Sequence, residues 1–188
     1  MVGDEVPKGI IAGNCFLMSE YFIYGDCHRR KSPEEGVCFM KKVSTGQGGG
    51  VMHLKHSVLE LETTTREELY DITERVRSEV EQSGIKNGLV SIYAQGATAA
   101  IMIQEGWDES VQNDVVTLLR KLVPHGGWEH DRQDGNADAH LKAGLVGPGE
   151  TVPLIDGRLG LSTWQNIFFC EFDGPRKMRR VVVTVIGT

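Results

Sequence analysis

The chain has 188 residues, of which 40% are hydrophobic and 24% charged, as is typical of a soluble globular protein with one well-buried core. Its formal net charge of −6 argues against a general nucleic-acid-binding protein, because such a protein needs a basic surface to displace counterions. The apolar stretch 10–24 is interrupted by Asn14, Ser19 and Glu20, which leaves no run long enough to span a membrane. Since the acidic start also lacks the positive region of a secretory signal, we expect a cytoplasmic protein.

Residues 1–50 differ in composition from the rest of the chain. They carry six basic and six acidic residues, so the whole net charge of −6 belongs to residues 51–188. They end in the glycine-rich run 46–50, which is typical of a flexible linker. We therefore predict a weakly ordered N-terminal extension over 1–50 and a compact domain over 51–188.

The regular part of the chain begins with a predicted strand over residues 53–61, at the end of which side chains alternate. A helix is predicted next, because Thr64 or Thr65 is followed three residues later by a glutamate, as in a capping box. Its apolar residues recur at helical spacing: Leu69, Ile72, Val76 and Val80. Gly84 suits the left-handed position that follows a helix, so we expect this helix to end there.

Two short apolar strands are predicted over residues 89–93 and 98–103. Asp108 is then placed to cap a second helix, and Pro124 ends it. The residues of this helix that are expected to face the core are Val111, Val115, Leu118, Leu119 and Leu122.

A third, short helix is predicted from Asn136 to about Leu145. The stripe expected to pack against a sheet consists of Ala137, Leu141 and Leu145. Three strands follow, over 152–155, 163–172 and 179–186. Strands at both ends with helices between them predict an α+β domain with a mostly antiparallel sheet or sandwich.

The polar segment 128–140 collects side chains of the types that bind metals or move protons near neutral pH. His130 and His140 are the best candidates for ligands of a divalent metal, with zinc in first place, or for an acid–base role. Asn136 lies four residues before His140, so the two share a helix face and Asn136 is a candidate catalytic neighbour. The alternative is that either histidine is hydrogen-bonded inside a turn for structural reasons.

Further candidates lie outside this segment. Glu105 follows an apolar strand and is a candidate base or ligand, although an exposed turn residue fits the pattern equally well. Gln165 begins an apolar strand, where a buried carboxamide needs a hydrogen-bond partner. Arg176 and Arg179 have forked donors that suit a phosphate, and the alternative is a solvated turn between two strands.

Several blocks of the sequence resemble the YjbQ-type family, which is also known as the secondary thiamine-phosphate synthase family. The blocks are Asn136-Ala137-Asp138-Ala139-His140, Gly147, Thr163-Trp164-Gln165 and Glu171-Phe172-Asp173-Gly174-Pro175-Arg176. Together they are specific, and the resemblance runs from Met52 to the C-terminus.

One position departs from the family pattern. Many members carry a His-Thr-Thr segment ahead of an acidic residue, at the strand equivalent to residues 98–103. This chain reads Gln95-Gly96-Ala97-Thr98 there, with Glu105 retained. Gly96 stands where the histidine would be, so the resemblance leaves Thr98 and Glu105 as the participants from this strand.

The resemblance implies a compact homotrimer that has a β-sandwich-like core with helices on one side. It also implies transferase activity that joins the pyrimidine and thiazole phosphates of thiamine. The first hypothesis is therefore an enzyme for small phosphorylated or pyrophosphorylated molecules, in which His130 and His140 hold a metal and Glu105 and Asn136 assist. The substrate-binding candidates are Thr98, Gln165, Arg176 and Arg179. The alternative is a non-catalytic trimer that binds a small ligand or a metal.

Overall fold

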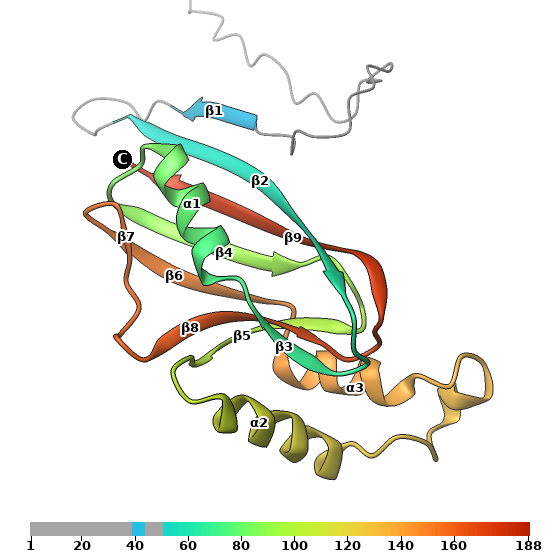
Figure 1. Ribbon diagram of the computed structural model, residues 1–188. Coiled ribbons are helices and arrows are strands. Elements are labelled where there is room, and N and C mark those ends of the chain that lie inside the picture. Colours follow the sequence, from blue (N-terminus) through green and yellow to red (C-terminus); the bar gives the residue numbers. More distant parts are fainter. Residues whose placement is uncertain (1–38, 44–50) are drawn as a thin grey trace, which may run out of the picture. The chain divides into compact units, whose positions relative to one another are not determined.

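The computed structural model describes residues 39–43 and 51–188, so most of the predicted extension lies outside the described residues. Within them the chain forms two antiparallel sheets and three α-helices (Figure 1). This arrangement confirms the predicted α+β class with an antiparallel, sandwich-like core. Residues 39–43 form a strand of the larger sheet, so this part of the predicted extension belongs to the folded unit. A domain boundary near residue 51 stays a prediction.

The larger sheet has six strands, and every neighbouring pair is antiparallel. In spatial order they are β1 (Phe39–Val43), β2 (Met52–Thr63), β9 (Arg176–Gly187), β4 (Gly88–Ala94), β6 (Gly149–Ile155) and β7 (Arg158–Leu159). The smaller sheet has three strands, which are β3 (Glu68–Asp71), β8 (Gln165–Glu171) and β5 (Ala99–Glu105). β2 and β9 pair from His53 opposite Gly187 to Thr63 opposite Arg176, which joins the two ends of the domain.

Helices connect the strands on both sides of the smaller sheet. They are α1 (Thr73–Ser83), α2 (Glu109–Leu122), the 3-10 helix η1 (Glu129–Arg132) and α3 (Ala137–Val146). As predicted, Asp108 caps α2 by accepting a hydrogen bond from the Ser110 backbone nitrogen (2.9 Å), and Gly84 follows α1 with a φ of 68°. Within the described residues, none of the helices combines the length and the apolar character needed to cross a membrane.

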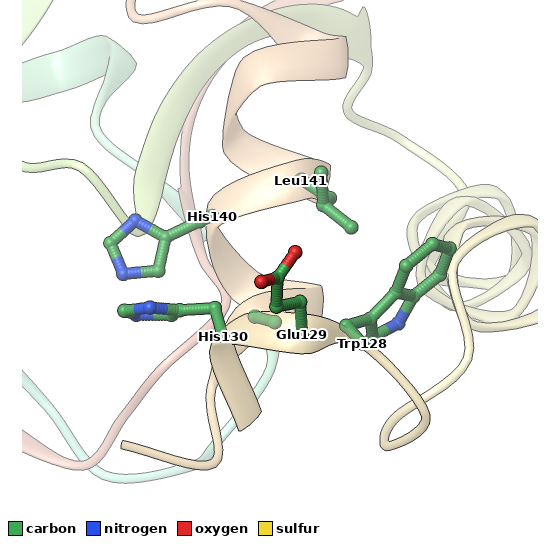
Figure 2. A pocket seen from close by; sticks show the side chains of 6 residues that line it. Trp128, Glu129, His130, His140 and Leu141 are labelled. Carbon is green, nitrogen blue, oxygen red and sulfur yellow. The ribbon is translucent and has the colours of Figure 1, made fainter. Parts of the chain in front are cut away.

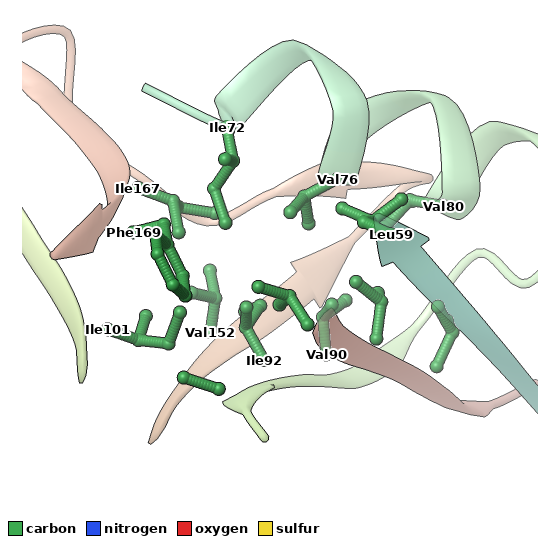
Figure 3. Packing of buried hydrophobic residues seen from close by; sticks show 14 of the residues in the cluster. Leu59, Ile72, Val76, Val80, Val90, Ile92, Ile101, Val152, Ile167 and Phe169 are labelled. Carbon is green, nitrogen blue, oxygen red and sulfur yellow. The ribbon is translucent and has the colours of Figure 1, made fainter. Parts of the chain in front are cut away.

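The smaller sheet separates two hydrophobic cores. The first core lies between the two sheets and α1, which contributes Val76 and Val80, and Ile72 just before the helix packs with them (Figure 3). The second core lies on the other face of the smaller sheet, where Leu119 of α2 and Ala143 of α3 cover it. Successive side chains of a strand point to opposite faces, so Phe169 of β8 enters the first core and its neighbour Phe168 the second.

The predicted start of the first helix is wrong. The helix begins at Thr73, and the segment before it is the strand β3, whose Leu69 packs in the second core. Thr65 Oγ1 does donate to Glu68 Oε2 (2.5 Å), but this bond lies in the turn between β2 and β3. The true start is marked by Asp71, whose Oδ1 accepts hydrogen bonds from the nitrogen (2.8 Å) and Oγ1 (2.6 Å) of Thr73.

The predicted inward faces of α2 and α3 are wrong in part. Leu118 and Leu122 of α2 are 54% and 58% exposed, and Leu141 and Leu145 of α3 are exposed as well. The residues that these helices do bury are Leu119, Ala137, Asp138, Ala139, Lys142 and Ala143. Because the buried face of α3 is made of alanines and an ion pair, its leucines point away from the sheet.

Candidate functional site

The segment between α2 and α3 is folded around the carboxylate of Asp131. Its Oδ2 accepts a hydrogen bond from the backbone nitrogen of Trp128 (2.9 Å), and its Oδ1 accepts one from that of Ala137 (3.1 Å). These bonds hold η1, which carries His130, against the first turn of α3, which carries His140.

The two predicted histidines lie next to each other. Their ring centroids are 5.1 Å apart and the rings meet edge to face, with 87° between their planes (Figure 2). They border a cavity of about 350 Å³, whose other lining residues are Trp128, Glu129, Ala137 and Leu141. Among the described residues, the buried Nε2 of His130 has no hydrogen-bond partner, and the carboxylate of Asp134 is 3.7 Å away. Because buried polar groups are normally satisfied, this nitrogen marks the pair as the candidate site.

His140 also borders a second cavity, of about 490 Å³. Its lining residues include Tyr93, Gln95, Gly96, Ala99, Ala143 and Gly144. His140 therefore belongs to the lining of both cavities.

A buried ionic network, which was not predicted from the sequence, holds α3 in place. Lys142 is fully buried and donates to Asp138 Oδ2 (2.8 Å) and Glu67 Oε1 (2.5 Å). On the other oxygen of Asp138, Arg66 Nη2 lies at 3.0 Å and His125 Nδ1 at 3.1 Å. The signal in the sequence is the spacing of Asp138 and Lys142, which lie four residues apart and so share a helix face.

Both carboxylates of this network stay charged. Burial alone would raise the pKa of Asp138, but hydrogen bonds from Lys142 and His125 outweigh burial, and the pKa is lowered. Burial likewise opposes ionisation of Glu67, and hydrogen bonds from Lys142 and Arg120 again outweigh it, so this pKa is lowered too. The network thus ties the helix that carries the second site histidine to the β2–β3 turn and to α2.

Thr98 and Arg179, both predicted to bind substrate, do lie together. Arg179 donates from Nε and Nη2 to the two oxygens of Glu171 (2.7 and 2.5 Å) and from Nη2 to Thr98 Oγ1 (3.0 Å). Thr63 Oγ1 donates to Glu171 as well (2.9 Å), and Glu171 is fully buried. This group therefore joins β9, β8 and the start of β5, and most of its donors are already engaged.

Asn136 and Arg176 meet at a shared carboxylate. Asn136 Nδ2 donates to Asp173 Oδ2 (3.0 Å), and Arg176 forms an ion pair with the same oxygen. The Oδ1 of Asn136 is buried without a hydrogen-bond partner among the described residues. Arg176 is about half exposed, so part of its guanidinium faces solvent beside the start of α3.

Glu105 and Gln165 lie elsewhere. They face each other as the last pair of β5 and β8, whereas Ala99 at the other end of β5 borders the second cavity of His140. Six residues of strand at ~3.3 Å each separate these ends by roughly 20 Å. Glu105 accepts hydrogen bonds from the backbone nitrogens of Trp107 (2.7 Å) and Asp108 (2.9 Å). Within one chain, Glu105 and Gln165 are therefore not ligands of an ion held by the histidine pair.

Residues 57–188 match the model of the family described as UPF0047 protein YjbQ-like. The chain belongs to the YjbQ family. A UPF0047 protein of Archaeoglobus fulgidus is 47% identical over 129 residues, which cover 68% of this chain and 98% of the relative. One of Methanocaldococcus jannaschii is 44% identical, over 68% of this chain and 91% of the relative.

Solved structures agree with this assignment. A protein of unknown function from Sulfolobus solfataricus, described as YbjQ-like, is 37% identical with a TM-score of 0.71, covering 73% of this chain and 99% of that chain. A hypothetical protein of Aeropyrum pernix is 35% identical with a TM-score of 0.66, covering 71% of this chain and 98% of that one. The resemblance inferred from the sequence blocks is confirmed.

The position that departs from the YjbQ pattern lies close to the site. Gly96 lines the same cavity as His140. A histidine at this position would add a second imidazole to that cavity wall, beside His140. In the part of the chain that the structure describes, no group of three or more His, Cys, Asp or Glu side chains is arranged to hold a metal ion.

Proposed function

We propose that the protein is a cytoplasmic homotrimer that binds and converts a small phosphorylated or pyrophosphorylated molecule at His130 and His140, with a divalent cation at the pair. The observation that carries this proposal is the buried, unbonded Nε2 of His130 beside His140 and a cavity of about 350 Å³. Imidazole nitrogens are common zinc ligands, and a catalytic zinc site keeps one position open for a substrate oxygen.

The spacing of the two rings suits such an ion. With zinc–nitrogen distances of ~2.0–2.1 Å, two imidazoles on one tetrahedral ion have ring centroids roughly 5 Å apart. The observed separation is 5.1 Å, and the edge-to-face arrangement requires one ring to turn about its Cβ–Cγ bond. Two histidines leave room for further ligands, which would be water, substrate oxygen or a side chain of another subunit.

The bound cation would neutralise charge on a phosphate or pyrophosphate leaving group. Substrate packing, proton transfer and binding of a second phosphate would fall to the chain's own residues. Trp128 and Leu141 line the cavity with apolar surface and would pack on the organic part of the substrate. Glu129 is the carboxylate that lines this cavity, and it would take the base role for which Glu105 was one candidate. The half-exposed guanidinium of Arg176 would receive a second phosphate.

Thiamine phosphate synthesis is the first reaction to test under this proposal. The support for it is the family resemblance alone, and it fits the substrate class because both precursors carry phosphates.

The alternative function is binding without turnover. It is favoured by the two-ligand character of the described site and by the engagement of Arg179 with Glu171. Product formation separates the two functions. A panel of phosphorylated metabolites that bind but give no product would leave binding as the function.

The decisive experiment is a zinc titration of metal-free protein at pH 7.5, with elemental analysis of the loaded sample. We expect one zinc per chain in the wild type and at least about a tenfold weaker uptake in His140→Ala, since that change removes one of two ligands. His56→Ala is the control, because His56 is exposed on β2 and bonds to Thr184 (2.9 Å). Equal uptake by wild type and His140→Ala would rule out the metal site.

A further inference from the structure

The second cavity beside His140 is separate from the first. It is formed by the end of β4, the loop that follows, the first residue of β5 and one side of α3. Its volume of about 490 Å³ is in the range of small-molecule sites. His140 is the one lining residue that it shares with the His130 cavity. We call it the Gly96 cavity.

Most residues that line the Gly96 cavity have small side chains, and none of them carries a formal charge. The glycines and alanines among its lining residues are Ala94, Gly96, Ala97, Ala99, Ala143 and Gly144. Tyr93 adds a half-exposed aromatic ring, and the polar groups come from Gln95 and His140. Transfer of an ion to such surroundings is costly, whereas a planar ring packs well against flat apolar walls and an aromatic face.

A hydrogen-bond donor lies next to Gly96. Arg179 uses Nε and Nη2 for Glu171 and Thr98, and no hydrogen bond from its Nη1 is present among the described residues. A Cβ on Gly96 would lie 3.3 Å from this Nη1, so the nitrogen lies against a residue that lines the cavity. Because Glu171 balances the guanidinium charge, Nη1 suits a neutral oxygen better than an anion.

We propose that the Gly96 cavity binds an uncharged planar ring that carries a carbonyl-type oxygen on its edge. The oxygen accepts a hydrogen bond from Arg179 Nη1, His140 bonds to a neighbouring edge atom, and Tyr93 packs against the ring. This inference rests on the proposed function in one respect, which is that the ring belongs to the molecule converted at the histidine pair. Ring binding itself requires neither metal nor turnover.

The test uses the full-length, metal-free chain and 2-pyridone, a neutral ring with an amide oxygen. In an NMR titration at pH 7.5, 2-pyridone should shift the resonances of Gly96, Ala97 and His140 and saturate at about millimolar concentration, as befits so small a ligand. Inorganic phosphate in a parallel titration should leave these resonances in place.

Gly144→Leu is the variant that fills the cavity. A Cβ on Gly144 meets nothing within 4 Å, and leucine favours a helix more than glycine does, so the fold should be kept. We expect 2-pyridone to bind at least about tenfold more weakly, a loss of ~1.4 kcal/mol. Lys121→Leu adds the same side chain to exposed α2 and should bind as the wild type does.

His130→Ala separates this proposal from the metal site. It removes a candidate zinc ligand that does not line the Gly96 cavity, so ring binding should persist while zinc uptake falls. Three results would each overturn the inference: no saturable shift at Gly96 and His140, larger shifts there with phosphate than with 2-pyridone, or unchanged binding in Gly144→Leu.

Discussion

Gly96→His is expected to strengthen zinc binding at the histidine pair. The new imidazole would supply a third ligand of the type that zinc prefers, on a cavity wall that includes His140. Its Cβ would lie 3.3 Å from Arg179 Nη1, a side-chain end that can shift by the small amount required. We expect the zinc dissociation constant to fall by at least about tenfold, measured by competition with a coloured chelator.

Gly96→Phe is the matched control for this change. It places an aromatic ring at the same position without a nitrogen to coordinate the ion. If the two variants bind zinc equally well, the gain does not come from a third ligand.

Cys170 is expected to be inert in the folded protein. It is fully buried in the second core, and burial raises its pKa to about 12. Because the thiolate is the reactive form, iodoacetamide at pH 8 should leave Cys170 unmodified until denaturant is added. Peptide mapping by mass spectrometry would detect the modification, and labelling in the native state would contradict the burial.

Among individual residues, the histidine pair could be predicted from the sequence, but the location of Glu105 and the burial of Lys142 could not. His130 and His140 flank a short helix start, so local reasoning could bring them together. Glu105 could not be placed, because a sequence shows that a strand ends but not which end of the sheet the histidines approach. Lys142 was overlooked because a lysine on a helix is normally solvent-exposed.

The helix α3 carries a charged side chain, Lys142, that is fully buried. Lys142→Met removes the buried ammonium group that Asp138 and Glu67 share, and leaves these two buried carboxylates close together. Breaking a buried ion pair in this way costs about 3–5 kcal/mol of the free energy of unfolding. Urea denaturation would measure the loss. Arg77→Met, in an exposed ion pair with Glu74, should cost less than about 1 kcal/mol.

The effect of Lys142→Met is expected to shrink in acid. The folded-state pKa values of Glu67 and Asp138 lie below their ordinary values of 4.5 and 3.8. Stabilisation from such depressed pKa values is fully present above the ordinary values and is lost as the pH falls through the lower, folded-state values. The difference in stability between wild type and variant, measured by denaturation curves, should therefore be smaller at about pH 3 than at pH 7. A constant difference in stability over this range would contradict the ionic account.

Most strands and helices could be predicted from the sequence, and the main error has a physical cause. Leu69 continues the helical spacing of Ile72 and Val76, so periodicity placed all three on one helix. In the structure, Leu69 instead lies in strand β3, which pairs with β8. There it is opposite Cys170, a residue about a hundred positions away in the sequence. Local patterns do not contain such a contact. The inward face of α3 was predicted wrongly for a similar reason. Its leucines are the larger apolar residues, so they were expected in the core, but the buried face consists mainly of alanines.

The outer face of the larger sheet is apolar over several strands. In neighbouring strands, Ile186 pairs with Leu54 on one side and Leu89 on the other, and Val182 pairs with Val58 and Tyr93. On this face, Leu89 is 49% exposed and Ile186 is 39% exposed. Exposed apolar surface of this kind is typical of contacts between proteins.

We therefore expect the predicted homotrimer to use this face. Light scattering at micromolar concentration should give three times the mass of one chain, and Leu89→Lys should lower that mass because it places a charge in the contact. Leu122→Lys, on the exposed side of α2, is the control and should leave the mass unchanged. A wild-type mass equal to one chain would rule out the trimer.

The position of β8 between the two cores limits which amino-acid substitutions this strand can tolerate. In a sheet with one solvent-exposed face, every second residue of a strand points to solvent and tolerates polar or bulky replacements. Residues 167–172 have no such face, because all six are buried, with apolar side chains entering one core or the other and Glu171 bound to Arg179. In a library of random single substitutions, this segment should therefore retain the smallest share of folded variants.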